Sequence, residues 1–284
     1  MNTTSLKSFN YLEDGRIIFS MLESIKTTKI LDPGLYSLYK TQSFSNSEII
    51  LAKETIKELH ELLPFHFLHK TDSIFNAFFN KNILKHVNNL NYNHKTGILL
   101  YGKQGTSKSS ILKHYYNRAI EEHNALVFYF SSLYCVEELW TFISDIRKIQ
   151  DNPIIIFLDE FDEVFKDKKE EFFKTIMDGH LSINNCMFLA TTNYIDVIPK
   201  AIKERPSRIK YLIEVEGVQE KPIIFHYLKQ SFKTLNIEIT NQQLSDLTDK
   251  SVGKTIDELK EIVLDKLMNI EKEEKQTKRI GFNT

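Results

Sequence analysis

A short apolar run leads into a loop of small residues in Gly97-Ile98-Leu99-Leu100-Tyr101-Gly102-Lys103-Gln104-Gly105-Thr106-Ser107-Lys108-Ser109. The run favours a buried strand, and the loop lets successive backbone N–H groups turn toward a phosphate at the start of a helix. Lys108 can then reach the β- and γ-phosphates of a nucleotide, and Ser109 can ligate Mg²⁺. The stretch therefore predicts an ATP-binding loop. The residues expected to contact ATP are Gly102, Lys103, Gln104, Gly105, Thr106, Ser107, Lys108, Ser109 and Ser110.

Ser107 departs from the usual form of such a loop, G-x-x-x-x-G-K-[ST], because serine stands where the second glycine normally does. A small side chain can still fit there. An unfavourable backbone angle at a non-glycine residue costs about 1 to 3 kcal/mol. We therefore expect Ser107 to weaken nucleotide binding without abolishing it.

A second apolar run, from Pro153 to Leu158, ends directly in Asp159 and Glu160. A continuous run rich in β-branched residues is typical of a strand that is buried on both faces of a parallel sheet. Ligands of such sheets lie at the carboxyl ends of the strands, so we expect both acids to face the phosphates. Asp159 would hold Mg²⁺ through water, and Glu160 would take a proton from the attacking water. The alternative is an ordinary helix N-terminus, where acids are also favoured.

A third apolar run, from Met187 to Thr192, ends in Asn193 and leads to Arg205-Pro206-Ser207-Arg208. This order of motifs resembles that of the AAA+ ATPases, especially their classic clade, over about residues 70–265. The matching segments are 97–109 for Walker A, 154–160 for Walker B, Asn193 for sensor 1, and Met177-Asp178-Gly179 for the short motif before the sensor strand.

The resemblance implies roles for three further residues. Arg205 would be the arginine finger that projects into a neighbour's site, and Arg208 would be the second, supporting arginine. Asn193 is suited to orienting the attacking water, because an amide both donates and accepts hydrogen bonds. An arginine finger contributes about 10³ to 10⁵ to the rate of GTPases, so assembly could switch hydrolysis on. The alternative for both arginines is a surface pair beside a turn proline.

The predicted fold class is α/β: a parallel five-stranded α/β/α sandwich of the P-loop (AAA+) type, followed by a small helical lid. We expect a mostly helical accessory region in residues 1–70, the large nucleotide-binding subdomain in 71–217 and the lid in 218–284. In the first region, Ser45 and Glu48 form a capping-box pair that predicts a helix ending before Pro64. The five strands are expected at 97–101, 125–130, 154–158, 187–192 and 211–215.

The composition agrees with a protein that has a sizeable core and no membrane span. The chain has 284 residues, 42% of them hydrophobic, and its formal net charge is only −1. That charge gives no argument for a general nucleic-acid binder, although a local basic patch stays possible. No signal-peptide core is evident, and the apolar runs are far shorter than a membrane span. We expect a cytoplasmic protein, and the Asn-, Lys- and Ile-rich composition fits an AT-rich genome such as that of a phage or a low-GC bacterium.

The sequence says less about the molecule on which the predicted ATPase would act. Classic-clade members resemble one another in forming six-membered rings that pull a protein through a central pore, with an aromatic residue on a loop after the second strand. The corresponding segment, residues 131–138, is shorter than usual and lacks the aromatic-apolar-glycine sequence. Tyr134 is the only natural candidate, and a buried tyrosine beside the sheet is an equal alternative.

Three functions therefore stay open. The first is a homo-oligomeric ATPase, a hexamer by resemblance, that remodels a protein or protein complex. The second is an AAA+ nucleic-acid machine, such as a helicase loader or a replication or recombination factor. The third is a nucleotide-gated scaffold in which Ser107 has spoiled catalysis. The intact Glu160, Asn193 and Arg205 argue against the third.

Overall fold

Five strands in the middle of the chain form the centre of one sheet. They are β6 (Lys95–Tyr101), β7 (Leu126–Tyr129), β8 (Ile154–Leu158), β9 (Cys186–Thr192) and β10 (Tyr211–Glu214), in the order β10-β6-β9-β8-β7. The pairs β6–β9, β8–β9 and β7–β8 are parallel. Every residue of β8 and β9 is buried, as expected for strands covered on both faces. The predicted α/β class and the positions of these strands are confirmed.

This computed structural model describes residues 8–11, 16–20, 27–28, 30–42, 47–55, 63–65, 68–130, 136–166 and 169–280. The chain divides into two compact units. The first, here called the sheet unit, comprises Met1–His60, Lys70–Tyr101 and Ser109–Ile213. The second, the lid unit, comprises Glu61–His69, Gly102–Lys108 and Glu214–Thr284. The expected boundaries at residues 70 and 217 stay predictions.

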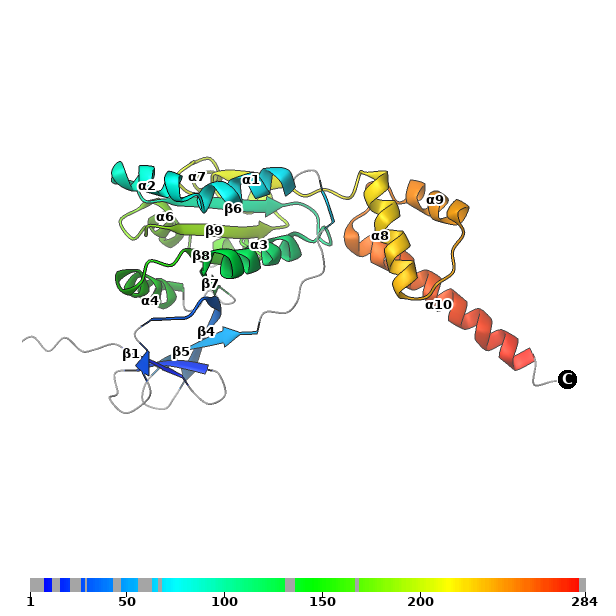
Figure 1. Cartoon of the computed structure of the whole chain (residues 1–284), viewed down its shortest axis with the longest axis horizontal. Helices are drawn as coiled ribbons and strands as arrows, with labels where there is room; N and C mark the ends of the chain where they lie inside the picture. Colours follow the sequence, from blue (N-terminus) through cyan, green and yellow to red (C-terminus); the bar gives the residue numbers. More distant parts are fainter. Residues whose placement is uncertain are drawn as a thin grey trace, which may run out of the picture. The chain divides into compact units, whose positions relative to one another are not determined.

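Helices accompany the central strands in the alternating manner of an α/β fold (Figure 1). On one face of β8, Ile156 and Leu158 belong to the same core cluster as Trp140 of helix α4 (Val136–Ile149). On the other face, the ring of Phe157 contacts Tyr116 of helix α3 (Lys108–His123), with ring centroids 5.3 Å apart. The strand is therefore packed between two helical layers. The helices of this part are α1 (Leu68–Phe78), α2 (Lys81–Asn89), α3 (Lys108–His123), α4 (Val136–Ile149), α5 (Glu163–Lys166), α6 (Glu170–Asp178) and α7 (Lys200–Lys203), with the 3-10 helix η2 (Ile195–Val197).

Within the described residues, strands in the N-terminal region extend the sheet to ten strands, so the expectation of five strands is wrong. The additional strands are β1 (Ser8–Tyr11), β2 (Arg16–Ser20), β3 (Thr27–Thr28), β4 (Gly34–Gln42) and β5 (Ser47–Glu54). Strand β4 runs parallel to β7, and β5, β2, β1 and β3 follow in that order. In Figure 1 this blue part continues from the β7 edge of the sheet.

The predicted helix after Ser45 is wrong, and so is the mostly helical character of residues 1–70 as far as residues 8–54 are described. Residues 47–54 pair with β4 along their whole length, from Leu35↔Glu54 to Gln42↔Ser47. The capping-box signal is local, whereas this pairing satisfies backbone groups that β4 would otherwise leave open at a sheet edge. Leu51 is only 1% exposed, so the burial of its apolar side chain also stabilises the strand.

The lid unit contains the three helices that the sequence predicts near its end. They are α8 (Lys221–Thr234), α9 (Asn241–Lys250) and α10 (Ile256–Ile280). Their apolar faces bury Leu228 and Phe232 of α8, Leu244 of α9 and Leu259 of α10. A capping box between Thr240 and Gln243 starts α9. Among the described helices of the chain, none is both long and apolar enough to cross a membrane.

Candidate active site

Three residues of the loop after β6 have positive backbone φ angles: Gly102 at 148°, Gly105 at 77° and Ser107 at 66°. Ser107 therefore occupies the left-handed region at the position where a glycine is usual. This conformation carries a cost of about 1 to 3 kcal/mol for a residue with a Cβ atom. The loop keeps its turn even though one of its glycines is replaced.

Lys108 is held inside this loop, with an exposed fraction of 6%. Its Nζ donates hydrogen bonds to the carbonyl oxygens of Gly102, at 2.8 Å, and Lys103, at 2.6 Å. The Thr106 hydroxyl lies 3.3 Å from the same nitrogen. Charged phosphate oxygens are stronger acceptors than carbonyl oxygens. An ammonium placed in this way can exchange these partners for a phosphate.

The first turn of α10 contacts the loop at Gly105. The backbone N–H of Asp257 donates to the Gly105 carbonyl at 3.2 Å. A Cβ atom on Gly105 would lie 3.0 Å from the Asp257 carboxylate and 3.1 Å from the Thr255 hydroxyl. Thr255 and Asp257 are thus residues at the start of this helix that touch the loop. No motif points to Asp257, because its importance depends on this contact.

The Asp159 carboxylate joins two neighbouring elements at the carboxyl edge of the sheet. Its Oδ1 accepts a hydrogen bond of 2.7 Å from the hydroxyl of Ser109, in the first turn of α3. It also accepts one from Thr191 of β9. The predicted metal-ligand pair, Ser109 and Asp159, is therefore in direct contact. A hydroxyl and a carboxylate are oxygen donors of the kind that Mg²⁺ prefers, so the residues present fit this ion.

Thr191 also fixes the turn that carries Glu160. Its hydroxyl accepts the backbone N–H of Glu160 at 3.1 Å, and its carbonyl accepts that of Phe161 at 2.7 Å. Glu160 itself has a φ of 52°, in the left-handed region. Two hydrogen bonds to Thr191 of β9 thus hold the turn that places Glu160, in an uncommon backbone conformation, directly after Asp159. Thr191 is a residue that sequence reasoning treated only as part of a strand.

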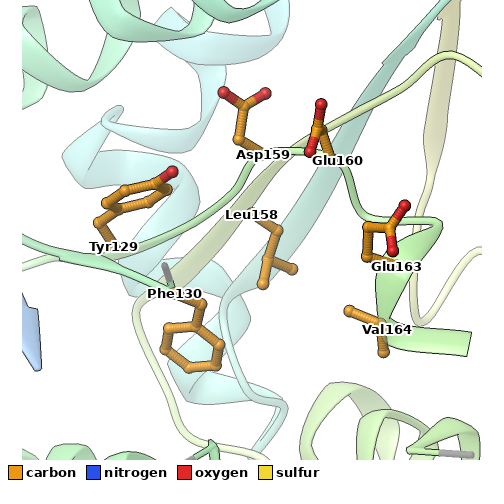
Figure 2. Close-up of a pocket in the computed structure, with 7 residues that line it drawn as sticks. All are labelled: Tyr129, Phe130, Leu158, Asp159, Glu160, Glu163 and Val164. Carbon is orange, nitrogen blue, oxygen red and sulfur yellow. The ribbon is translucent and has the colours of Figure 1, made fainter. Parts of the chain in front are cut away.

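A hollow of about 150 Å³ opens beside these acids. Figure 2 shows its lining: Tyr129, Phe130, Leu158, Asp159, Glu160, Glu163 and Val164. Burial raises the pKa of Tyr129, and the charges of Asp159 and Glu160 raise it further. The phenol therefore keeps its proton at neutral pH and can donate a hydrogen bond. Sequence reasoning missed Tyr129, whose only signal is a hydroxyl at the end of an apolar strand.

Asn193 directly follows β9, which lies between β6 and β8 in the sheet. The neighbouring backbone is fixed by Thr192, whose hydroxyl donates to the buried Asp162 at 2.6 Å and accepts the Tyr194 N–H at 2.9 Å. Parallel strands place their carboxyl ends at one edge, so Asn193 shares the edge of Asp159. This placement agrees with the predicted sensor position but does not test its role.

The two predicted arginines lie around Asp178, at the end of α6. Arg208 is buried and forms an ion pair with Asp178, with its Nε 3.0 Å from the carboxylate, and a terminal nitrogen of its guanidinium donates a hydrogen bond to the Ala201 carbonyl. The Ser207 hydroxyl donates to Asp178 at 2.9 Å. Arg205 is 62% exposed and lies 3.8 Å from the same carboxylate. Neither arginine forms an ion pair with Asp159 or Glu160 within the described part of the chain.

The pKa of Asp178 lies below its usual value. Burial alone would raise this pKa, but the hydrogen bonds from Ser207 and Arg208 and the charges of Arg208 and Lys95 outweigh that effect. The amino group of Lys95 donates to the Met177 carbonyl, one residue before Asp178. The carboxylate is therefore a charged anchor for the Arg205–Arg208 segment.

Tyr134, the candidate pore-loop residue, lies outside the described residues.

Comparison with known proteins finds similarities in the central part of the chain. Residues 98–216 match the model of the AAA family, "ATPase family associated with various cellular activities". The "ATPase family gene 2 protein" of Schizosaccharomyces pombe is 29% identical over 171 residues, which are 55% of this chain and 20% of that protein. An "AAA ATPase forming ring-shaped complexes" of Bifidobacterium adolescentis is 29% identical over 159 residues, which are 46% of this chain and 31% of the relative.

A third relative is the "Proteasome-activating nucleotidase" of Saccharolobus solfataricus, 29% identical over 185 residues, which are 56% of this chain and 44% of that protein. The chain thus spans less than half of the length of these relatives. Its place in the classic clade stays a prediction. The family match runs from β6 to just beyond β10 and includes the loop, Asp159, Asn193 and both arginines. Residues 98–216 of the chain are therefore similar to the AAA family of ATPases.

Proposed function

We propose that this chain binds ATP with Mg²⁺ and hydrolyses it to ADP and phosphate. The observation that carries the proposal is the contact between Ser109 and Asp159, with Glu160 as the next residue. It unites a hydroxyl and a carboxylate suited to Mg²⁺ with a second acid that can act as a base. The buried Lys108 in a loop with left-handed turns supports the same proposal.

The chemistry assigns each residue one task. Ser109 and Asp159 would hold Mg²⁺, which supplies positive charge to the phosphate oxygens when bound. Lys108 adds charge at the same phosphates. Glu160 takes a proton from water as the water oxygen attacks the terminal phosphorus, and the bond to the ADP oxygen breaks. Asn193 orients that water.

The further proposal is a ring-shaped homo-oligomer, a hexamer, that remodels a protein or protein complex. The exposed guanidinium of Arg205 supports it, because an arginine finger has to reach beyond its own subunit. The name of the Bifidobacterium relative, which forms ring-shaped complexes, supports it as well. A nucleic-acid machine is the alternative, and the following experiment separates the two.

The experiment uses Glu160→Gln in the full chain. The amide cannot accept the proton, so we expect ATP turnover to fall by about 10²- to 10⁴-fold while ATP binding persists. Glu163→Gln is the matched control, because it makes the same change at another acid of the hollow in Figure 2. The control should keep wild-type turnover. Light scattering with ATP and Mg²⁺ then reports the size of the assembly.

The material that stays bound to the Glu160→Gln protein identifies the target. Mass spectrometry and nuclease treatment, each compared with wild type, distinguish a retained protein from a retained nucleic acid. A retained protein supports remodelling, and a retained nucleic acid favours the alternative. Absence of turnover in the wild-type protein would contradict the ATPase proposal and leave the nucleotide-gated scaffold.

A further inference from the structure

Tyr129 is held beside the proposed catalytic acids by the register of two parallel strands. It lies opposite Phe157 in the β7–β8 pair, and the centroids of the two rings are 5.2 Å apart. Phe157 precedes Asp159 by two residues, so these side chains leave the strand on the same face. The strand pairing therefore fixes a phenol next to the strand end that carries Asp159 and Glu160.

The hydroxyl of Tyr129 points toward the side of the hollow where Asp159 lies (Figure 2). Within the described residues it has no hydrogen-bond partner. The buried phenol of Tyr115, by contrast, donates to Asp72 at 3.0 Å. A hydroxyl that lies near the charges of Asp159 and Glu160, and that bonds to none of the described residues, is available to a molecule in the hollow.

When they are ionised, the acids of the hollow accept hydrogen bonds and donate none. A water molecule that donates a hydrogen bond to Glu160 has a fixed orientation only when another group donates a hydrogen bond to the water oxygen. Tyr129 is a donor on this side of the hollow, and its ring is held by Phe157.

We propose that Tyr129 is a positioning residue for hydrolysis, whose hydroxyl donates a hydrogen bond to the water that Glu160 deprotonates. This inference rests on the proposed ATPase function. The water oxygen keeps one lone pair for attack on the terminal phosphorus, and its proton goes to Glu160. The bond from phosphorus to the ADP oxygen breaks, and Tyr129 keeps its proton throughout.

Tyr129→Phe tests the inference because it removes the hydroxyl and keeps the ring on Phe157. We expect kcat to fall about 10- to 100-fold, the range for a lost positioning contact, while the KM for ATP changes less than about twofold. Affinity for ADP alone should stay unchanged. Affinity for ADP with aluminium fluoride and Mg²⁺, a mimic that includes the attacking water, should fall about tenfold.

Tyr116→Phe is the matched control. Tyr116 packs on the same Phe157 ring, at 5.3 Å, but does not line the hollow. Its variant should match the wild type in kcat and in binding of the fluoride complex. Thermal unfolding of both variants should match the wild type, since neither ring is lost.

Each result separates the inference from the function on which it rests. Wild-type kcat in Tyr129→Phe would overturn the role of Tyr129 and leave the ATPase proposal standing. An equal fall in both tyrosine variants would also overturn it, because the effect would then come from packing around Phe157. A wild-type protein that binds ATP without turnover would overturn the proposed function, and this inference with it.

Discussion

At the scale of single residues, Ser107 is the position where the loop departs from the usual phosphate-binding pattern and the structure shows a physical consequence. Its φ of 66° is natural for glycine and costly for serine. Ser107→Gly should raise the free energy of unfolding by about 1 kcal/mol, after allowance for the greater entropy of an unfolded glycine. ATP should bind more tightly, because the loop then adopts its turn without strain. Urea unfolding and ATP titration measure the two effects.

Asn124→Gly is the control for this prediction. Asn124 has a φ of 53° but lies at the end of α3, remote in sequence from the loop. Asparagine tolerates the left-handed region better than most residues, so this variant should change stability little and ATP affinity not at all. Equal ATP affinities of Ser107→Gly and the wild type would show that strain at Ser107 does not limit binding.

At the scale of elements, Asp178 ties the end of α6 to the segment that carries both arginines. Its lowered pKa makes the ionised form the stabilising one. The contribution is therefore present above the unfolded pKa and is lost as pH falls below about 4. Asp178→Asn should lower the free energy of unfolding at pH 7 by about 3 kcal/mol, because Arg208 stays buried without its anion.

The pH dependence gives this prediction its specific signature. The difference in unfolding free energy between wild type and Asp178→Asn should shrink as pH is lowered from 7 to 3. Asp196→Asn, at an exposed acid of η2, serves as the control and should behave as the wild type. A difference that stayed constant with pH would mean that the ionised carboxylate of Asp178 is not the stabilising group.

The elements also show what the sequence could and could not predict. The strands β6, β8 and β9 were predictable because each is a continuous apolar run ended by a functional residue. The strand β5 was not predictable, because it pairs with β4. The position of β4 is set in turn by its pairing with β7, about ninety residues away in the chain. Ser109 and Asp159 were predictable as a pair because a family motif encodes them. Tyr129 and Asp257 matter through register and contact, which no local pattern encodes.

At the scale of the whole molecule, the exposed Arg205 predicts that active sites are shared between subunits. Under the proposed function, Arg205→Ala keeps its own Lys108 and Glu160 but cannot supply the finger, whereas Glu160→Gln supplies a finger and lacks the base. Each protein alone should lose most turnover, by about 10³-fold or more for the arginine. Mixed in equal amounts and allowed to exchange subunits, they should recover about a quarter of wild-type turnover, since a closed ring pairs neighbours at random.

This recovery has one physical source, because only an interface between the two variants has both a base and a finger. Arg208→Ala should not behave in the same way, since its guanidinium is buried against Asp178 in its own subunit and its loss would disturb folding. A phosphate-release assay on the mixture, with light scattering to confirm that mixed rings form, measures the outcome. Mixed rings without recovered turnover would assign Arg205 to its own subunit's site or to none, and the arrangement of sites between neighbouring copies would have to be abandoned.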